Sequence, residues 1–309
     1  MKKAARRPLM TALRAQPDAA RSDAAVAAAR HFAGSVVAAT RSDAARAADG
    51  GAAPPGAFCW PPRPPGQAGR RPTVGLYLPL SYELDVLPMV AAAFAGGCRV
   101  FFPHIHTDPA AVASAGSRMV FVEATSPADI DVVFRPQPPY NIRGATPEAL
   151  AAAVPFDQSG DDDAERQPPL RALVTAAAAA AGALDVVVVP GVAFDAASGA
   201  RLGKGGGFYD EFFAPAAVAR AAAGTLATSG PQLVGVGFDF QRWGAPLPGV
   251  ADAAAPCGDG TVSPGTAVLV VGGGASPLPL DAWDVPVQWL LTPAAGLAPV
   301  APPPPPLPA

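Results

Sequence analysis

The segment that most constrains the fold is residues 184–210, which read LDVVVVPGVAFDAASGARLGKGGGFYD. Residues 185–189 are a short β-branched run that does not alternate between polar and apolar, which is the pattern of a strand buried on both faces. A polar turn, a glycine-rich loop and an aromatic helix start follow it. This order predicts a flexible, cation-bearing loop at the carboxyl end of a buried strand, which is where open α/β sheets form their ligand crevices.

Further strands and helices are predicted by the pattern of apolar residues along the chain. Short apolar runs indicate strands at residues 73–78, 99–102, 119–123, 233–238 and 285–291. Helical patterns occupy residues 1–47, 81–95, 170–183 and 209–223. Because strands and helices alternate, we expect an α/β fold whose sheet is mostly parallel or mixed, with helices on both faces.

Length, composition and charge indicate which kinds of macromolecular partner the chain could bind. The chain has 309 residues, which suits one large or two small domains, but its 39 prolines and 32 glycines indicate that part of it is not ordered. The formal net charge of −3 provides no overall basic field for nucleic acid. The longest apolar stretch, residues 172–184, is too short to span a bilayer. We therefore expect neither a nucleic-acid nor a membrane partner.

The cysteines and the N-terminus bear on the compartment. Cys59, Cys98 and Cys257 lie far apart without CxxC spacing, so neither a disulfide framework nor a zinc site is indicated. We expect a reducing, cytoplasmic location. The N-terminus is basic and has no acidic residue before Asp18, which fits an organellar transit peptide (mitochondrion or plastid) as well as a first helix of the domain.

The glycine-rich loop suits a phosphate group. Gly203 and residues 205–207 lack Cβ atoms, so the backbone can approach a ligand and turn several N–H groups toward one anion. Arg201 and Lys204 add two cations, and a helix that begins near Phe208 would add its N-terminal dipole. On composition alone, a mobile surface turn is the competing interpretation.

Asp210, at the end of the loop, is better placed for Mg²⁺ that bridges phosphate oxygens than for direct contact with phosphate.

The spacing of the glycines in this loop matches neither GxxxxGK[ST] nor a well-placed GxGxxG, so a P-loop or a Rossmann fingerprint is excluded.

The loop and its surroundings also carry a family pattern, approximately PGvaFD..G.RLG.G.GyYD. It appears here as PGVAFD at residues 190–195, GARLG at 199–203 and GFYD at 207–210. Other pieces follow in the family's order: Lys2 and Arg6 ahead of Leu13-Arg14, then TVGLYLPLSYELDV, VFFPHI, MVFVEATSPADI, LVGVGFDFQ and WDVPVQWLLTP. In these segments the chain resembles the 5-formyltetrahydrofolate cyclo-ligases.

The resemblance implies a three-layer α/β sandwich with a mostly parallel or mixed central sheet, of the CoA-transferase-like type. Residues 1–293 would form a single domain with low-complexity insertions at 48–72 and 249–282. Residues 294–309 would be a disordered, Pro-rich tail. We also expect the protein to be a monomer.

The resemblance further implies ATP- and Mg²⁺-dependent conversion of 5-formyltetrahydrofolate, with or without a polyglutamate tail, to 5,10-methenyltetrahydrofolate, ADP and phosphate. A formamide oxygen is a poor leaving group. Transfer of the γ-phosphoryl group to that oxygen would let N10 close the ring as phosphate departs, and such transfer depends mainly on positioning and charge neutralisation.

Site residues follow from the same resemblance. Arg201, Lys204 and Tyr209 would be catalytic. ATP would be held by Lys2, Arg6, Arg201, Leu202, Gly203, Lys204, Gly205, Gly206, Gly207, Phe208 and Tyr209. The folate would be bordered by Glu83, Met119, Tyr140 and Tyr209. Asp210 and Asp284 would bind Mg²⁺.

Each of these assignments has a structural alternative. Lys2 and Arg6 could form a solvated helix face, and Met119 could be core filler. Tyr209 could pack on the sheet, and Glu83 could favour a helix dipole. Asp284 could be a turn residue before a strand.

A separate pair, His104 and His106, could bind a metal, although no third ligand is evident.

Several positions depart from the family pattern, mainly near the C-terminus. Trp283 stands where a histidine is common, Gln288 replaces the second aspartate and Pro293 the closing glutamate. Phe208 replaces the first tyrosine, and residues 140–144 lack the Glu-Pro of the corresponding turn. These changes leave fewer carboxylates for the expected metal site near the C-terminus. The alternatives are therefore a diverged paralogue that binds folate or nucleotide without turnover, or a different carbohydrate-phosphate or acyl-transfer enzyme on a related fold.

Overall fold

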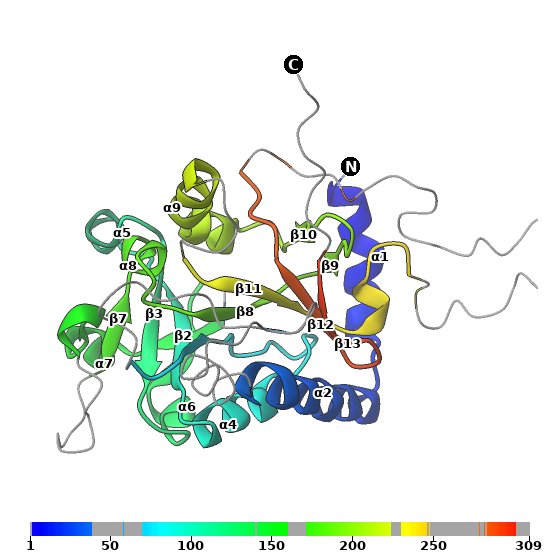
Figure 1. Ribbon diagram of the computed structural model, residues 1–309, viewed down its shortest axis with the longest axis horizontal. Helices are drawn as coiled ribbons and strands as arrows, with labels where there is room; N and C mark the ends of the chain where they lie inside the picture. The colour runs from blue at the N-terminus through cyan, green and yellow to red at the C-terminus, as the bar shows by residue number, and fades with distance from the viewer. Residues whose placement is uncertain are drawn as a thin grey trace, which may run out of the picture.

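A nine-stranded mixed sheet forms the centre of the molecule, in the order β13-β12-β11-β8-β1-β2-β3-β7-β6 (Figure 1). The computed structural model describes residues 2–38, 58, 70–139, 141–159, 171–223, 230–245, 247, 278, 281 and 283–300. The strands of this sheet are β1 (Thr73–Gly75), β2 (Arg99–Ile105), β3 (Met119–Ala124), β6 (Val154–Pro155), β7 (Ala172–Val174), β8 (Val186–Pro190), β11 (Gln232–Val236), β12 (Trp289–Thr292) and β13 (Gly296–Pro299).

The direction of the strands decides which side chains meet at the ligand edge. β2, β1, β8, β11 and β12 run parallel, so their carboxyl ends share one edge of the sheet. β3 runs antiparallel to β2, which brings the start of β3 to that same edge. β13 is antiparallel to β12 at the far end of the sheet.

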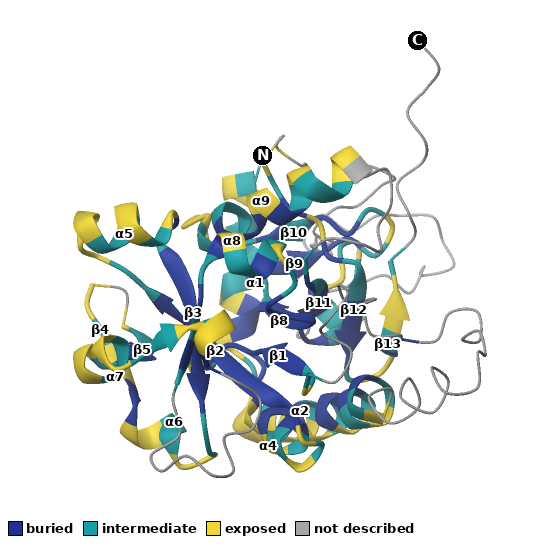
Figure 2. Ribbon diagram, turned by 60° about the vertical axis from the view of Figure 1, so that its left-hand side comes forward, coloured by how far each residue is buried: buried dark blue, intermediate teal, exposed yellow. Residues whose placement is uncertain are grey.

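Helices cover both faces of the sheet, and β8 shows why the chain folds this way. Val186 and Val188 pack in one hydrophobic cluster, while Val187 and Val189 pack in another on the opposite face. The first cluster includes side chains of α1 (Lys2–Arg14), α2 (Asp18–Phe32) and α4 (Leu87–Ala95). The second includes side chains of α8 (Ala176–Ala180) and α9 (Phe208–Ala223). The strands lie buried between these helices (Figure 2), so the predicted three-layer α/β sandwich is confirmed.

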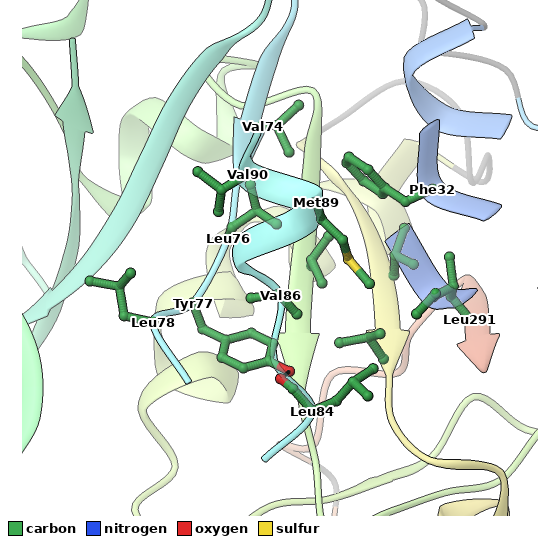
Figure 3. Close-up of a cluster of buried hydrophobic side chains, with 14 of the residues drawn as sticks. Phe32, Val74, Leu76, Tyr77, Leu78, Leu84, Val86, Met89, Val90 and Leu291 are labelled. Atoms are coloured by element: carbon green, nitrogen blue, oxygen red, sulfur yellow. Dashed lines mark hydrogen bonds between the residues drawn. The ribbon is translucent and has the colours of Figure 1, made fainter. Parts of the chain in front are cut away.

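The first cluster also holds the segment that follows β1 in place. Figure 3 shows Met89 of α4 gathered with Phe32 of α2, Val74 of β1 and Leu291 of β12. Each such buried side chain stabilises the fold by about 1.5–3 kcal/mol. Tyr77 is buried in the same cluster, and its hydroxyl donates a hydrogen bond of 2.9 Å to the Leu84 carbonyl, which closes the turn after β1.

Smaller elements complete the described chain. They are α5 (Pro109–Ala115), α6 (Asp129–Val132), α7 (Pro147–Ala151), the π-helical turn Ala33–Val37, the 3₁₀ turns Phe156–Gln158 and Asp239–Gln241, and two hairpins. The hairpins are β4 (Phe134–Gln137) with β5 (Ile142–Ala145), and β9 (Ala193–Phe194) with β10 (Arg201–Leu202). Neither hairpin was predicted.

Three predicted helices differ from the structure. The helix expected over residues 1–47 is interrupted before Pro17, the N-cap of α2, and residues 39–47 lie outside the described chain. The helix expected over 81–95 begins only at Leu87, whose N–H is bonded at 2.9 Å to Asp85 Oδ1. Residues 170–183 are not one helix: β7 precedes α8, because pairing with β3 outweighs the helix propensity of the alanines.

The predicted tail from residue 294 is also partly wrong. Gly296 adopts a φ of 72°, a left-handed conformation that suits glycine, and the chain then runs back along β12 as β13. Residues 301–309 and nearly all of the predicted insertions at 48–72 and 249–282 lie outside the described residues. The helices within the described ranges include none that is long and apolar enough to cross a membrane.

Candidate functional site

A cleft of about 800 Å³ opens at the carboxyl edge of the sheet. Its walls come from α1, the segment after β1, the end of β2, the start of β3, and the loop that connects β10 to α9. Among the lining residues are the predicted site residues Lys2, Arg6, Glu83, Met119, Asp210 and Asp284 and all of residues 201–209. The structure therefore brings together every predicted site residue except Tyr140, which lies outside the described chain.

The hairpin that leads into the glycine loop is fixed by a short turn. Asp195 accepts hydrogen bonds from Ala197 N at 2.9 Å and Ser198 Oγ at 2.8 Å. Gly199 has a φ of 73°, and a Cβ at this position would lie 2.3 Å from the Val287 carbonyl oxygen, so only glycine fits. This turn places β10 so that Arg201 lines the cleft.

The glycine loop itself is exposed and depends on glycine for its shape. Gly205 and Gly207 adopt φ angles of 109° and 68°. Arg6 Nε donates a hydrogen bond of 2.8 Å to the Gly203 carbonyl, which links α1 to the loop. Arg6 therefore binds the backbone of the loop and also lines the cleft.

Arg201 and Asp210 form an ion pair of 2.8 Å at the base of the loop. Asp210 also accepts a bond of 3.3 Å from the Val285 N–H, which ties α9 to the segment before β12. The guanidinium of Arg201 lies 5.5 Å from the centre of the Tyr209 ring. Burial, together with the charge of Glu83, raises the pKa of Tyr209 far above its ordinary value, so this phenol keeps its proton at neutral pH.

Lys204 crosses the cleft to the segment after β1. Its Nζ lies 2.6 Å from Glu83 Oε1 and 5.2 Å from the centre of the Tyr82 ring. The other carboxylate oxygen of Glu83 accepts a bond of 2.9 Å from the Leu80 N–H. The side chain of Glu83 is only 9% exposed, so its charge is compensated mainly by Lys204.

Lys2 completes a third charged contact. Its Nζ lies 2.8 Å from Asp281 Oδ2 and also contacts Asp284 Oδ2. Burial works against the charged amine, but the hydrogen bonds to the two aspartates outweigh it and raise the pKa of Lys2. The Asp284 side chain also accepts a bond of 2.8 Å from the Asp281 N–H.

The predicted Mg²⁺ ligands Asp210 and Asp284 both line the cleft, but each is paired with a cation. Among the described residues, no group of three or more His, Cys, Asp or Glu side chains could hold a metal ion. Two carboxylates nevertheless fit Mg²⁺ when phosphate oxygens and water supply the remaining ligands. The metal role of the two aspartates stays a prediction.

The comparison with known families decides the assignment. The model of the 5-formyltetrahydrofolate cyclo-ligase family matches residues 67–242, which include the segment after β1, β3 and the whole glycine loop. The chain belongs to this family. It is similar to the 5-formyltetrahydrofolate cyclo-ligase of Saccharomyces cerevisiae, with 70% identity over 30 residues, which are 10% of this chain and only 14% of the yeast protein.

The chain is also similar to a solved structure, over a longer range. The 5,10-methenyltetrahydrofolate synthetase from Mycoplasma pneumoniae aligns over 94% of this chain and 98% of its own, with 13% sequence identity and a TM-score of 0.42.

Two predicted folate neighbours differ in their surroundings. Met119 is 1% exposed, packs among core side chains and also lines the cleft, and its contact with folate stays a prediction. Tyr209 packs against Phe213 with a ring-centre distance of 6.3 Å.

Some cleft residues were not predicted. Arg118 and Glu211 line the cleft and bind each other, with Arg118 Nε 2.6 Å from Glu211 Oε2. Trp283, singled out only as a departure from the cyclo-ligase pattern, lines the cleft and is 70% exposed. Arg118 immediately precedes a predicted strand, but only the antiparallel direction of β3 brings that position to the ligand edge.

His104 and His106 lie side by side, with ring centres 5.0 Å apart. Burial, and to a lesser extent the neighbouring His106, lowers the pKa of His104 to about 4. Within the described ranges no third side chain joins the two rings as a metal ligand. The pair is therefore neutral at physiological pH, as expected for histidines at the end of a buried strand.

Proposed function

We propose that this chain converts 5-formyltetrahydrofolate to 5,10-methenyltetrahydrofolate in an ATP- and Mg²⁺-dependent reaction that releases ADP and phosphate. The observation that carries the proposal is that a cationic, glycine-rich wall and a wall with a carboxylate and an apolar side chain face each other in one cleft. The glycine loop with Arg201 and Lys204 provides phosphate-binding chemistry, and Glu83 with Met119 faces it across the cleft. Membership of the cyclo-ligase family supports the choice of reaction.

The cations of the cleft suit the phosphoryl-transfer step. Four cations, Arg201, Lys204, Lys2 and Arg6, line the same cleft, and each can neutralise charge on the phosphates of ATP. Mg²⁺ held by Asp210 and Asp284 would add further neutralisation on the transferring group. The Gly205 and Gly207 backbone, open and without side chains, allows phosphates to approach the loop N–H groups.

The opposite wall suits a pterin. Glu83 is a nearly buried carboxylate that can accept hydrogen bonds from the ring N–H groups once Lys204 turns to a phosphate. Met119 provides an apolar surface, and Tyr209 remains protonated and can donate a hydrogen bond. These residues hold the formyl oxygen near the γ-phosphoryl group.

The reaction then balances as follows. The formyl oxygen forms a bond to the γ-phosphorus as the bond to ADP breaks. N10 attacks the formyl carbon, and phosphate leaves with the former formyl oxygen and the electron pair of the C–O bond. The N10 proton is lost to solvent, so no base is required from the protein at this step.

An isotope experiment tests the proposal. The formyl oxygen of 5-formyltetrahydrofolate is labelled with oxygen-18, and the products are analysed by mass spectrometry. We expect the label in inorganic phosphate, with ADP and methenyl product formed in equal amounts. Label released to water without ADP would refute phosphorylation. Binding of ATP and folate with no product would instead identify a non-catalytic relative.

A further inference from the structure

Arg118 joins the two walls of the cleft. It immediately precedes β3, whose first residue Met119 lies on the proposed folate wall. The Arg118 N–H donates to Glu211 Oε1 at 2.8 Å, and Nε donates to Glu211 Oε2 at 2.6 Å. Glu211 belongs to the first turn of α9, so this contact fixes the start of that helix against β3.

The same guanidinium also holds the glycine loop. Arg118 Nη2 donates a bond of 3.0 Å to the Gly206 carbonyl, and the guanidinium lies 4.8 Å from the centre of the Phe208 ring. In a trans peptide the C=O and the following N–H point in opposite directions. A bond that fixes the Gly206 carbonyl on Arg118 therefore also fixes the direction of the Gly207 N–H.

The loop needs such support because its glycines have no side chains to hold them. Residues 204–207 are exposed, and the backbone of glycine loses the most conformational freedom when it is ordered. Arg6 holds the Gly203 carbonyl at 2.8 Å, and Arg118 holds the Gly206 carbonyl near the other end. Hydrogen bonds from Arg118 also outweigh burial and lower the pKa of Glu211, which keeps this carboxylate charged.

We infer that Arg118, oriented by Glu211, is a positioning residue that sets the phosphate-binding shape of the glycine loop without itself binding ATP. The inference rests on the proposed function for the identity of the ligand. The competing role is a direct one, in which Arg118 is simply another cation on the phosphates. The two roles predict different behaviour for Glu211 and for lysine at position 118.

Four variants distinguish the roles. Arg118→Lys keeps the charge but loses the planar fork that holds Glu211 and Gly206 together. A positioning role predicts that Arg118→Lys raises KM for ATP about tenfold, nearly as much as Arg118→Ala, with KM for 5-formyltetrahydrofolate changed less than about twofold. It also predicts that Glu211→Gln raises KM for ATP and that the Arg118→Ala/Glu211→Gln double variant is no worse than Arg118→Ala. A direct role predicts activity close to wild type for Arg118→Lys and for Glu211→Gln, and that result would overturn the inference.

The matched control, Arg171, immediately precedes β7 and contacts the far end of β3. Arg171 contacts the Glu123 carbonyl and lies 3.0 Å from Asp129 Oδ2, so it also joins a carbonyl and a carboxylate, but it does not line the cleft. Arg171→Ala should reduce stability and leave KM for ATP unchanged. If Arg171→Ala raises KM for ATP as much as Arg118→Ala does, the effect is general destabilisation and the inference fails.

A measurement without turnover separates this inference from the proposed function. Amide hydrogen exchange of the peptide that covers residues 203–208 is followed in the full chain with and without inorganic tripolyphosphate. We expect tripolyphosphate to protect the loop in the wild type and in Arg171→Ala, and to protect it much less in Arg118→Ala and Arg118→Lys. Equal protection in all four proteins would overturn the inference. Absence of cyclo-ligase turnover in the wild type would reject the proposed function and leave this comparison intact.

Discussion

Lys204 Nζ lies 2.6 Å from Glu83 Oε1, although the two residues come from opposite walls of the cleft. In the proposed reaction Lys204 binds phosphate and Glu83 binds the pterin. In the absence of ligands the two side chains form an ion pair with each other instead. Nucleotide that draws Lys204 away would leave the nearly buried Glu83 without its cation. Hydrogen-bond donors on the folate could then replace that cation, and we therefore expect the two ligands to bind cooperatively.

The first prediction concerns this coupling. A non-hydrolysable ATP analogue should lower the Kd of 5-formyltetrahydrofolate about twofold to fivefold, because a partly exposed ion pair contributes up to about 1 kcal/mol. In Lys204→Met the folate should bind with the same Kd with and without the analogue. Lys3→Met, which removes an exposed lysine of α1 that does not line the cleft, should behave as wild type. Calorimetric titration measures both constants, and coupling that survives in Lys204→Met would refute the exchange.

Glycine conformation in the loop gives a second prediction. Gly205→Ala places a side chain at a φ of 109°, so the loop must shift, and we expect KM for ATP to rise about tenfold. Gly97→Ala is the matched control, since Gly97 has a φ of 77°, has open space around its Cβ position and lies at the end of α4. It should lower the free energy of unfolding by about 1 kcal/mol and leave KM unchanged. Equal KM values in the two variants would contradict the role of the loop.

Metal binding provides a third prediction. Asp210→Asn should lower kcat by about a hundredfold or more and raise the Mg²⁺ concentration for half-maximal rate, since a metal at the transferring phosphoryl group contributes several kcal/mol. Asp281→Asn removes a cleft carboxylate that pairs with Lys2 but has no proposed metal role. Its Mg²⁺ dependence should match the wild type. An unchanged Mg²⁺ titration for Asp210→Asn would remove Asp210 from the metal site.

The histidine at the end of β2 predicts a pH dependence of stability. His104 has a pKa of about 4 in the folded chain, against 6.5 for an ordinary histidine, so the unfolded chain binds this proton first. Stability should therefore fall as the pH drops from about 6.5 to about 4. Urea unfolding at several pH values should show a shallower fall for His104→Asn. The same slope in both proteins would mean that His104 does not cause the effect.

The C-terminal strand gives a fifth prediction. Truncation after Val300 keeps the four pairs between β12 and β13, so Tm should match that of the full chain. Truncation after Pro293 removes β13 and exposes the edge of β12, and Tm should fall by about 5 °C or more. Thermal unfolding followed by circular dichroism compares the three proteins. Equal Tm values would show that β13 contributes nothing to stability.

The sequence predicted the central strand, the loop and the helix after it because three independent signals coincide between residues 184 and 210. The unalternating valines, the clustered glycines and the aromatic helix start each need only local information. Membership of the cyclo-ligase family followed from the same segment and is confirmed.

The sequence did not predict features that depend on contacts distant in the chain. β7 reads as part of an alanine-rich helix and becomes a strand only through its pairing with β3. Arg118 reaches the cleft only because β3 is antiparallel, and Asp281 gains its contact with Lys2 across 279 residues. Such pairings are tertiary, and no local pattern of residues encodes them.

The most direct test of the account is the absorbance of 5,10-methenyltetrahydrofolate in reactions with purified protein. The account predicts that the absorbance rises only when 5-formyltetrahydrofolate, ATP and Mg²⁺ are all present, and that ADP accumulates at the same rate. Product formed without ATP, or no product when all three are present with a folded protein, would contradict it.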